Sequence, residues 1–202
     1  MEEPGCKRDE SGGGEKTRSE ADHLADQNAL LRASVAEMRD RISELEEQSE
    51  SDPATGLPDE RRFFQEVERV VGYANRHGTP AALLYVHLDG LAAIAEARGR
   101  LAADAALIHV GKTLSRLIRS TDVLAAIGSQ QFGLILDHLD HNSAIETAER
   151  LARCIAGNPV ELGGSPVSVA VTIGTATILP GDTAEDVIKR ADRNMCVARA
   201  EG

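Results

Sequence analysis

A heptad repeat that stops at Asp52-Pro53 divides this chain into two parts that must fold differently. Between residues 20 and 51 apolar side chains recur every seven positions, at d (Leu24, Leu31, Met38, Leu45) and at a (Ala21, Val35, Ile42). Proline disfavours helix in the residue before it, so the helical period ends at Asp52. The pattern predicts a coiled-coil helix over residues 20–51 and a globular domain over residues 52–202.

The heptads favour a parallel two-stranded coil. Val35 and Ile42 are β-branched residues at a, and mostly leucine occupies d, the combination typical of parallel dimers. Asn28, also at a, fixes the register because only its symmetry mate satisfies its amide. The alternative is an amphipathic helix packed on its own domain, but heptads held in phase with a polar a position exceed what such a helix needs. We therefore expect a homodimer through residues 20–51.

Composition excludes several classes of function. Residues 1–19 are rich in Gly, Ser and alternating charge, which predicts a disordered tail. The 33 acidic residues outnumber the 22 basic ones and no basic stripe is present, so nucleic acid is not an expected partner. No apolar run reaches the roughly 20 residues of a membrane span, and no signal-peptide pattern is visible, which predicts a cytoplasmic protein without a membrane partner. Three cysteines without C-x-x-C spacing predict reduced thiols and no zinc site.

From residue 52 onward, helical and strand periods alternate. A helix is predicted to end near Gly78, with Phe63, Phe64 and Val67 facing inward. After it we expect a strand (81–89), two helices (to 119), a β-hairpin (122–137), a helix (141–156), a strand (166–178) and a helix (183–200) capped by Asp182 or Thr183. This order predicts an α+β fold in which a mixed or antiparallel sheet is faced by helices.

The same order, together with DPATGLPDERRFF at residues 52–64, closely resembles the GGDEF domain of bacterial diguanylate cyclases. Further matching stretches are ALLYVHLD (82–89), GSQQF (128–132), VTIGTAT (171–177) and VIKRADRNMCVARAEG (187–202). The resemblance extends from Asp52 to the chain end. It implies a palm-like α+β fold similar to nucleotide cyclases, in which two domains each present one GTP and join them into cyclic di-GMP.

The resemblance also implies a two-magnesium site, from which this sequence departs. The family's metal-binding carboxylates, at the end of the first strand and at the third letter of the signature hairpin, match His87 and Gln130. Gln131 replaces the acidic fourth letter, and Ser129 replaces the second glycine, which a turn tolerates at negative φ. Imidazole and amide are poorer Mg²⁺ ligands than carboxylate. We therefore expect a degenerate domain with no metal, no cofactor and no diguanylate cyclase activity.

One of the family's two base-reading side chains is missing from this sequence. The family's base-reading asparagine matches Ala95, whereas Asp104 matches the second base-reading residue. Asp89 and Lys189 match positions that the family places near metal or phosphate, so they are candidates for residual nucleotide contacts. The alternatives are a strand-end or cap residue for Asp89, a solvated helix lysine for Lys189, and a satisfied strand histidine for His87.

A possible ligand site remains next to the signature hairpin. Arg119-Ser-Thr-Asp122, five residues before Gly128, matches the R-x-x-D inhibitory site with which many family members bind their product. Arg150 matches an arginine that the family uses from the far side of that site, although Ala126 stands at a position that is often basic. An arginine fork can bind guanine O6 and N7, and a carboxylate can accept from guanine N1 and N2. Ordinary surface pairs are the alternative.

Three functions follow from these observations. The first is a receptor that binds cyclic di-GMP through Arg119, Asp122 and Arg150 and passes occupancy to a partner through the coil. The second is an interaction module that pairs with itself or with another signalling protein and binds no nucleotide. The third, a residual cyclase or GTP-binding regulatory domain, is the least supported, because four positions lack a required group: His87, Ala95, Gln130 and Gln131.

Overall fold

The computed structural model describes residues 27–28, 30–39 and 50–201. The chain divides into two compact units, Met1–Ser49 and Glu50–Gly202. In the first unit residues 30–39 are helical, and the predicted stripe residues Leu31, Val35 and Met38 are exposed. The predicted tail (1–19) and the predicted heptad residues at 20–26 and 40–49 lie outside the described residues.

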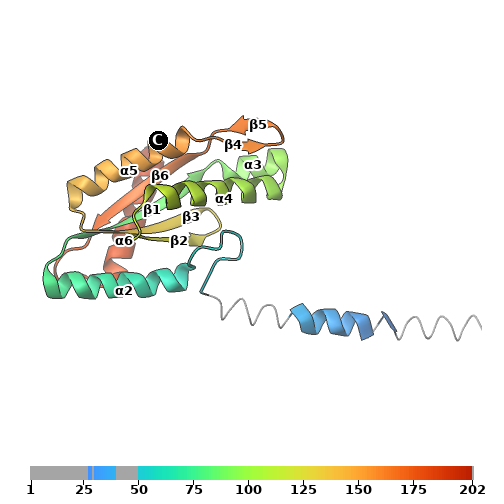
Figure 1. Cartoon of the computed structure of the whole chain (residues 1–202), viewed down its shortest axis with the longest axis horizontal. Coiled ribbons are helices and arrows are strands. Elements are labelled where there is room, and N and C mark those ends of the chain that lie inside the picture. Colours follow the sequence, from blue (N-terminus) through green and yellow to red (C-terminus); the bar gives the residue numbers. More distant parts are fainter. Residues whose placement is uncertain (1–26, 29, 40–49, 202) are drawn as a thin grey trace, which may run out of the picture. The chain divides into compact units, whose positions relative to one another are not determined.

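The second unit contains the predicted alternation of helices and strands (Figure 1). Its elements are α2 (Glu60–His77), β1 (Ala81–Asp89), α3 (Leu91–Arg98), α4 (Arg100–Leu117), β2 (Val123–Gly128), β3 (Gln131–Asp137), α5 (His141–Ala156), β4 (Val160–Leu162), β5 (Ser165–Val167), β6 (Ala170–Thr177) and α6 (Ala184–Glu201). As predicted, Gly78 ends α2, in the left-handed conformation that glycine adopts without strain.

Four strands form one antiparallel sheet in the order β2-β3-β1-β6. Helices cover both faces of this sheet (Figure 1), so the central strand β1 is buried along nearly its whole length. The predicted α+β fold, with an antiparallel sheet flanked by helices, is confirmed.

Side chains of β1 alternate between two hydrophobic cores, as the pleat of a strand requires. Leu84 and Leu88 lie in the core that also contains residues of α4 and α5, whereas Leu83 and Tyr85 lie in the core formed with α2 and α6. The same alternation places His87 on the face of the sheet that α2 and α6 cover.

Three details differ from the prediction. The expected strand 166–178 is divided into β5 and β6, because residues 168–169 belong to neither strand. The strand β5 instead pairs with β4 across a tight turn formed by Gly163 and Gly164, both at positive φ. Phe64 is 37% exposed, since the buried stripe of α2 runs through Phe63 and Val67. The helix α4 ends at Leu117, two residues before the predicted end at 119.

Two glycines allow helices to lie unusually close to the sheet. A Cβ atom at Gly133 would overlap the ring of Phe63 on α2, and one at Gly174 would overlap the backbone of Ala191 and Met195 on α6. A larger residue at Gly174 would therefore have to push α6 away from the sheet, whereas one at Gly133 would have to displace the ring of Phe63.

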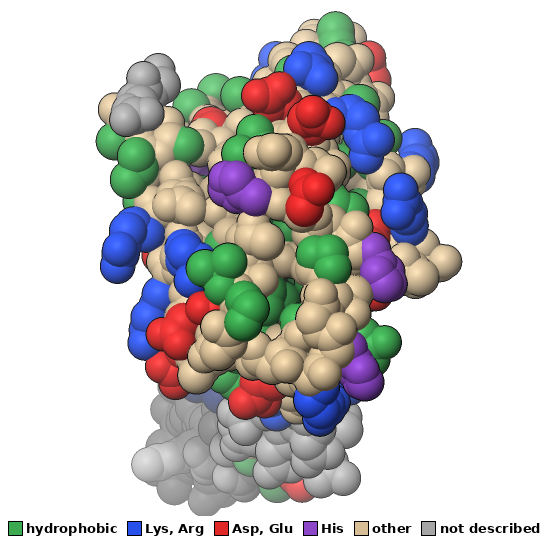
Figure 2. Space-filling view, turned by 90° about the vertical axis from the view of Figure 1, so that its left-hand side faces the viewer, with side chains coloured by type: hydrophobic (Ala, Val, Ile, Leu, Met, Phe, Trp, Pro, Cys, Tyr) green, Lys and Arg blue, Asp and Glu red, His purple; other side chains and the backbone are tan. Residues whose placement is uncertain are grey.

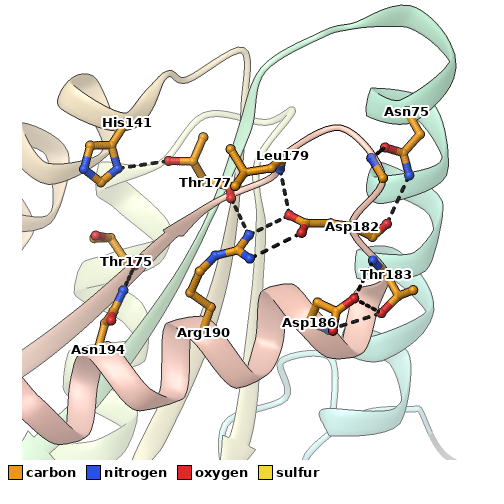
Figure 3. A network of polar contacts seen from close by, with 11 residues as sticks. Asn75, His141, Thr175, Thr177, Leu179, Asp182, Thr183, Asp186, Arg190 and Asn194 are labelled. Atoms are coloured by element: carbon orange, nitrogen blue, oxygen red, sulfur yellow. Dashed lines mark hydrogen bonds and ion pairs between the residues drawn. The ribbon is translucent and has the colours of Figure 1, made fainter.

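Polar side chains hold α6 against the open edge of β6 (Figure 3). Arg190 donates to the Thr177 carbonyl at 2.7 Å and to Asp182 Oδ2 at 2.6 Å, and Asn194 donates to the Thr175 carbonyl at 2.8 Å. In the register with β1, both carbonyls point away from that strand, so α6 satisfies edge groups that no described strand pairs.

The start of α6 is a reciprocal cap. The N–H of Asp186 donates to Thr183 Oγ1 at 3.3 Å, and the N–H of Thr183 donates to Asp186 Oδ2 at 3.1 Å. Of the two predicted caps, Thr183 is therefore the N-cap, while Asp182 receives Arg190. No described helix is long and apolar enough to cross a membrane.

Candidate functional site

The end of β1 and the tip of the β2–β3 hairpin lie side by side. His87 is opposite Gln131 in the antiparallel register, and the N–H of Leu88 donates to the Gln130 carbonyl at 2.9 Å. Ser129 in the turn does not have a positive φ, so the predicted condition for serine at that position is met. The structure thus brings together His87, Gln130 and Gln131, the three positions of the predicted lost metal site.

His87 is a buried imidazole without a hydrogen-bond partner. The residue is 5% exposed, and neither Nδ1 nor Nε2 has a partner among the described residues. Burial is the main cause that lowers the pKa of His87 below its ordinary value; Arg199 lowers it further, and Asp89 acts in the opposite direction. The folded domain therefore favours the neutral imidazole. The alternative expectation is a strand histidine satisfied in the core or at the rim: His87 is a buried strand residue, but no described group bonds to either ring nitrogen.

The carboxylate of Asp89 already has partners within the domain. Its Oδ2 accepts a hydrogen bond from Thr172 Oγ1 at 2.8 Å, and its Oδ1 lies 3.7 Å from Nε of Arg199 and 3.9 Å from Nε2 of His87. The sequence pattern did not single out Arg199. It is near the end of α6, and only the packing of that helix along β6 brings it to the end of β1.

Lys189, a candidate for a residual nucleotide contact, lies farther back along α6 than Arg199. It pairs with Glu185 at 2.9 Å, and 69% of its side chain is exposed. It precedes Arg199 by ten positions, which is about 15 Å along a helix. The structure does not bring Lys189 to Asp89, and a solvated helix lysine is the better description.

Ala95 and Asp104 lie on α3 and α4, which pack against each other across the Gly99 turn. Both residues are half-buried. The methyl group of Ala95 offers no hydrogen bond, so Asp104 supplies the only polar side chain of this predicted pair.

The residues at this end of the sheet do not fit a pair of magnesium ions. Mg²⁺ prefers carboxylate and phosphate oxygens in near-octahedral geometry. Here His87 and Gln130 occupy two expected carboxylate positions, and Asp89 already faces Arg199. In the part of the chain that the structure describes, no group of three or more His, Cys, Asp or Glu side chains could hold a metal ion.

His87→Leu is expected to stabilise the domain by about 1–3 kcal/mol at pH 7.5, because it removes two buried nitrogens that have no partner. It should also weaken the response to acid. The folded-state pKa of His87 is lowered, so the unfolded chain takes up the proton first. The stability present above about pH 6.5 is then lost as the pH falls through the folded-state pKa. Urea unfolding at pH 7.5 and 5.5 measures both effects, and a variant as acid-sensitive as the wild type would contradict this account.

A second group of predicted residues lines one cavity of about 390 Å³. Arg119 and Asp122 come from the turn between α4 and β2, and Arg150 comes from α5. The structure therefore brings together all three residues of the predicted R-x-x-D site.

Asp122 closes the turn through the backbone. Its Oδ2 accepts from the N–H of Arg119 at 2.8 Å, and its Oδ1 accepts from the N–H of Asp137 at 3.3 Å. Within the described residues, the guanidinium groups of Arg119 and Arg150 make no hydrogen bond or ion pair. The surface ion pair expected as the alternative for Arg119 and Asp122 is not formed, and both guanidinium groups keep their donors available.

Two charged or titratable residues that line this cavity were not identified from the sequence. Glu146 lies one helical turn before Arg150 on α5, and His138 follows β3. Glu146 had a usable signal, its i, i+4 spacing from Arg150. Figure 2 views the end of the domain at which α5 begins, where acidic, basic and histidine side chains are interspersed.

A family model described as "Diguanylate cyclase, GGDEF domain" matches residues 49–202. The chain belongs to the GGDEF family. Among curated relatives, diguanylate cyclase DgcP of Pseudomonas aeruginosa is 26% identical over 202 residues, covering 93% of this chain and 30% of that protein. The response regulator PleD of Caulobacter vibrioides is 28% identical over 168 residues, covering 82% of this chain and 37% of that protein. This GGDEF protein thus spans about a third of the length of these relatives.

Solved structures show the same fold. The GGDEF domain of FimX from Pseudomonas aeruginosa has a TM-score of 0.72 at 25% identity, over 76% of this chain and 96% of that one. The coiled coil and GGDEF domain of DgcB from Caulobacter crescentus, in complex with c-di-GMP, has a TM-score of 0.72 at 20% identity, over 89% and 95%. The predicted palm-like GGDEF fold is confirmed.

Proposed function

We propose that this GGDEF protein is a catalytically inactive signalling protein that binds cyclic di-GMP at the cavity formed by Arg119, Asp122 and Arg150. The observation that carries the proposal is the pair of guanidinium groups without a partner among the described residues, which face one cavity together with an ordered carboxylate. The relatives named above include the diguanylate cyclase DgcP and a GGDEF structure in complex with c-di-GMP.

Each side chain has a defined part in this proposal. The fork of Arg119 would donate to guanine O6 and N7, and Arg150 would contact a phosphate or stack on a base. Asp122 uses one acceptor position on each oxygen for the backbone, and the remaining lone pairs would accept from guanine N1 and N2.

Titration calorimetry with cyclic di-GMP tests the proposal. We expect the wild-type protein to bind, and Arg119→Ala to bind about 30-fold or more weakly, because a bidentate charge-assisted contact is lost. Arg153→Ala is the matched control, since Arg153 lies on α5 but does not line the cavity. No heat with the wild-type protein, or equal losses for both variants, would eliminate the receptor function.

The proposed inactivity rests on the end of β1. With His87, Gln130 and Gln131 in place of carboxylates, and with Ala95 unable to read a base, the domain lacks groups needed to align two nucleotides with two metal ions. Incubation with GTP and Mg²⁺ should yield no cyclic dinucleotide. Steady accumulation of product would overturn this part of the proposal.

We further propose that the first unit dimerises as a parallel coiled coil. The exposed residues Leu31, Val35 and Met38 share one helical stripe, which a second copy would cover. Leu31→Pro should therefore halve the mass measured by light scattering at micromolar concentration. Arg32→Ala, a neighbouring exposed position outside the stripe, should leave the mass unchanged. An unchanged mass for Leu31→Pro would contradict the coil.

An interaction module without nucleotide is the second candidate. It would pair with itself or with another signalling protein, and its arginines would have no ligand. The calorimetry above separates the two candidates. The structure of SiaD of Pseudomonas aeruginosa in complex with its activator SiaC, 23% identical to this chain, is one in which a relative of the same fold has a protein partner.

A further inference from the structure

His138 lies between two cavities. It lines the cavity of about 390 Å³ together with Arg119 and Arg150, and also a neighbouring cavity of about 130 Å³ that Arg69 and Tyr73 of α2 line. A side chain that lines both cavities is part of the wall of the proposed ligand site, where a bound dinucleotide would meet it.

The backbone holds His138 in an uncommon conformation. Its φ of 55° makes it the one described non-glycine residue in the left-handed region, which histidine and asparagine tolerate better than most residues. The N–H of His138 donates to Asp137 Oδ1 at 3.0 Å, and the N–H of Asp137 donates to Asp122 Oδ1 at 3.3 Å. The placement of His138 is therefore tied to the same turn that positions Arg119.

The charges that face this histidine do not add up to a positive site. The α4–β2 turn contributes Arg119 and Asp122, and α5 contributes Glu146 and Arg150. The end of β3 contributes Asp137, whose Oδ2 lies 3.7 Å from His138 Nε2. On the α2 side, Tyr73 contributes a phenol, and Arg69 is already paired with Glu66 at 2.7 Å.

A ligand with two phosphodiester groups would thus enter a cavity whose two arginines are balanced by carboxylates. An imidazolium in the wall of the cavity would supply the missing positive charge. Histidine is the side chain that can gain a charge near neutral pH. Its ring here is 69% exposed, so it is free to turn from Asp137 towards a phosphate.

We propose that His138 is a ligand-contacting residue that takes up a proton from solvent when cyclic di-GMP binds, so that the affinity of this site rises as the pH falls. This inference rests on the proposed function. The imidazole gains at most one proton from the buffer for each dinucleotide bound, and no covalent bond changes.

Calorimetry at pH 7 in two buffers of different ionisation enthalpy measures the proton uptake directly. For the wild-type protein we expect a fractional uptake, and a Kd about fivefold weaker at pH 8 than at pH 6. His138→Asn keeps a residue that tolerates the left-handed backbone but cannot be protonated. It should show no uptake and nearly the same Kd at both pH values.

His141→Asn is the matched control. His141 is also exposed, but its Nδ1 pairs with Thr177 Oγ1 at 3.1 Å and it does not line the cavity, so this variant should behave as the wild type does. If the wild type binds without proton uptake, or if His138→Asn retains it, the role of His138 is refuted while the receptor function stands. If the wild type does not bind, the receptor function fails and this inference with it.

Discussion

Gly174→Val should destabilise the domain by about 3 kcal/mol or more, a large part of the 5–15 kcal/mol that stabilises a typical domain. At this position a Cβ atom would overlap the backbone N of Met195 and the carbonyl O of Ala191. Backbone atoms inside a helix cannot rotate aside as the end of a side chain can. The helix α6 would have to move, although Arg190 and Asn194 anchor it to the edge of β6.

Gly72→Ala is the control for this prediction. Gly72 lies inside α2, and a Cβ atom there would meet nothing within 4 Å. Because alanine loses less conformational freedom than glycine on entering a helix, we expect a gain of about 0.5–1 kcal/mol. Urea unfolding measures both variants. If Gly174→Val were as stable as the wild type, the close packing of α6 on β6 would be wrong.

Restoring two carboxylates should restore a divalent cation site. In the double variant His87→Asp/Gln130→Asp, two new oxygen-ligand groups would stand close together, because the Leu88 N–H reaches the Gln130 carbonyl at 2.9 Å. Asp89 lies beside them and could add a third carboxylate. We expect Mn²⁺, used as the probe for Mg²⁺, to bind at least about tenfold more tightly than to the wild type.

The control for the double variant adds the same charges elsewhere. Gln65→Asp/Asn142→Asp places two carboxylates at exposed positions of α2 and α5, and it should not change Mn²⁺ binding. Electron paramagnetic resonance of free Mn²⁺ gives the affinity of each protein. If the wild type already bound Mn²⁺ as tightly as the double variant, the proposed loss of the metal site would have to be given up.

Much of the fold was predictable because local periods agree with the tertiary arrangement. Residues 81–89 read as a buried strand, and the structure places that strand between two others under helices on both faces. The hairpin β4–β5 was not predicted as an element, although Gly163-Gly164 is a hairpin signal. Three-residue strands are too short to show a period of two against a neighbouring β-rich run.

The candidate sites were predictable to different degrees. Arg119, Asp122 and Arg150 could be grouped because the first two share a turn and the family resemblance supplied the third. The pairing of Asp89 with Arg199 could not be predicted, because residues 110 positions apart meet only through the packing of α6 along the sheet. The match to the family motif singled out Lys189 and not Arg199. Because Lys189 lies ten positions earlier on α6, it is far from Asp89.

The amino-acid sequence by itself determined the alternation of helices and strands, the GGDEF family and the identity of the groups at each signature position, because these depend on local periods and residue types. Only the tertiary structure decided which groups face one another. It left His87 buried without a partner, gave Asp89 an internal cation, and set His138 between two cavities. These outcomes depend on how separate elements pack, which no single segment of the chain encodes.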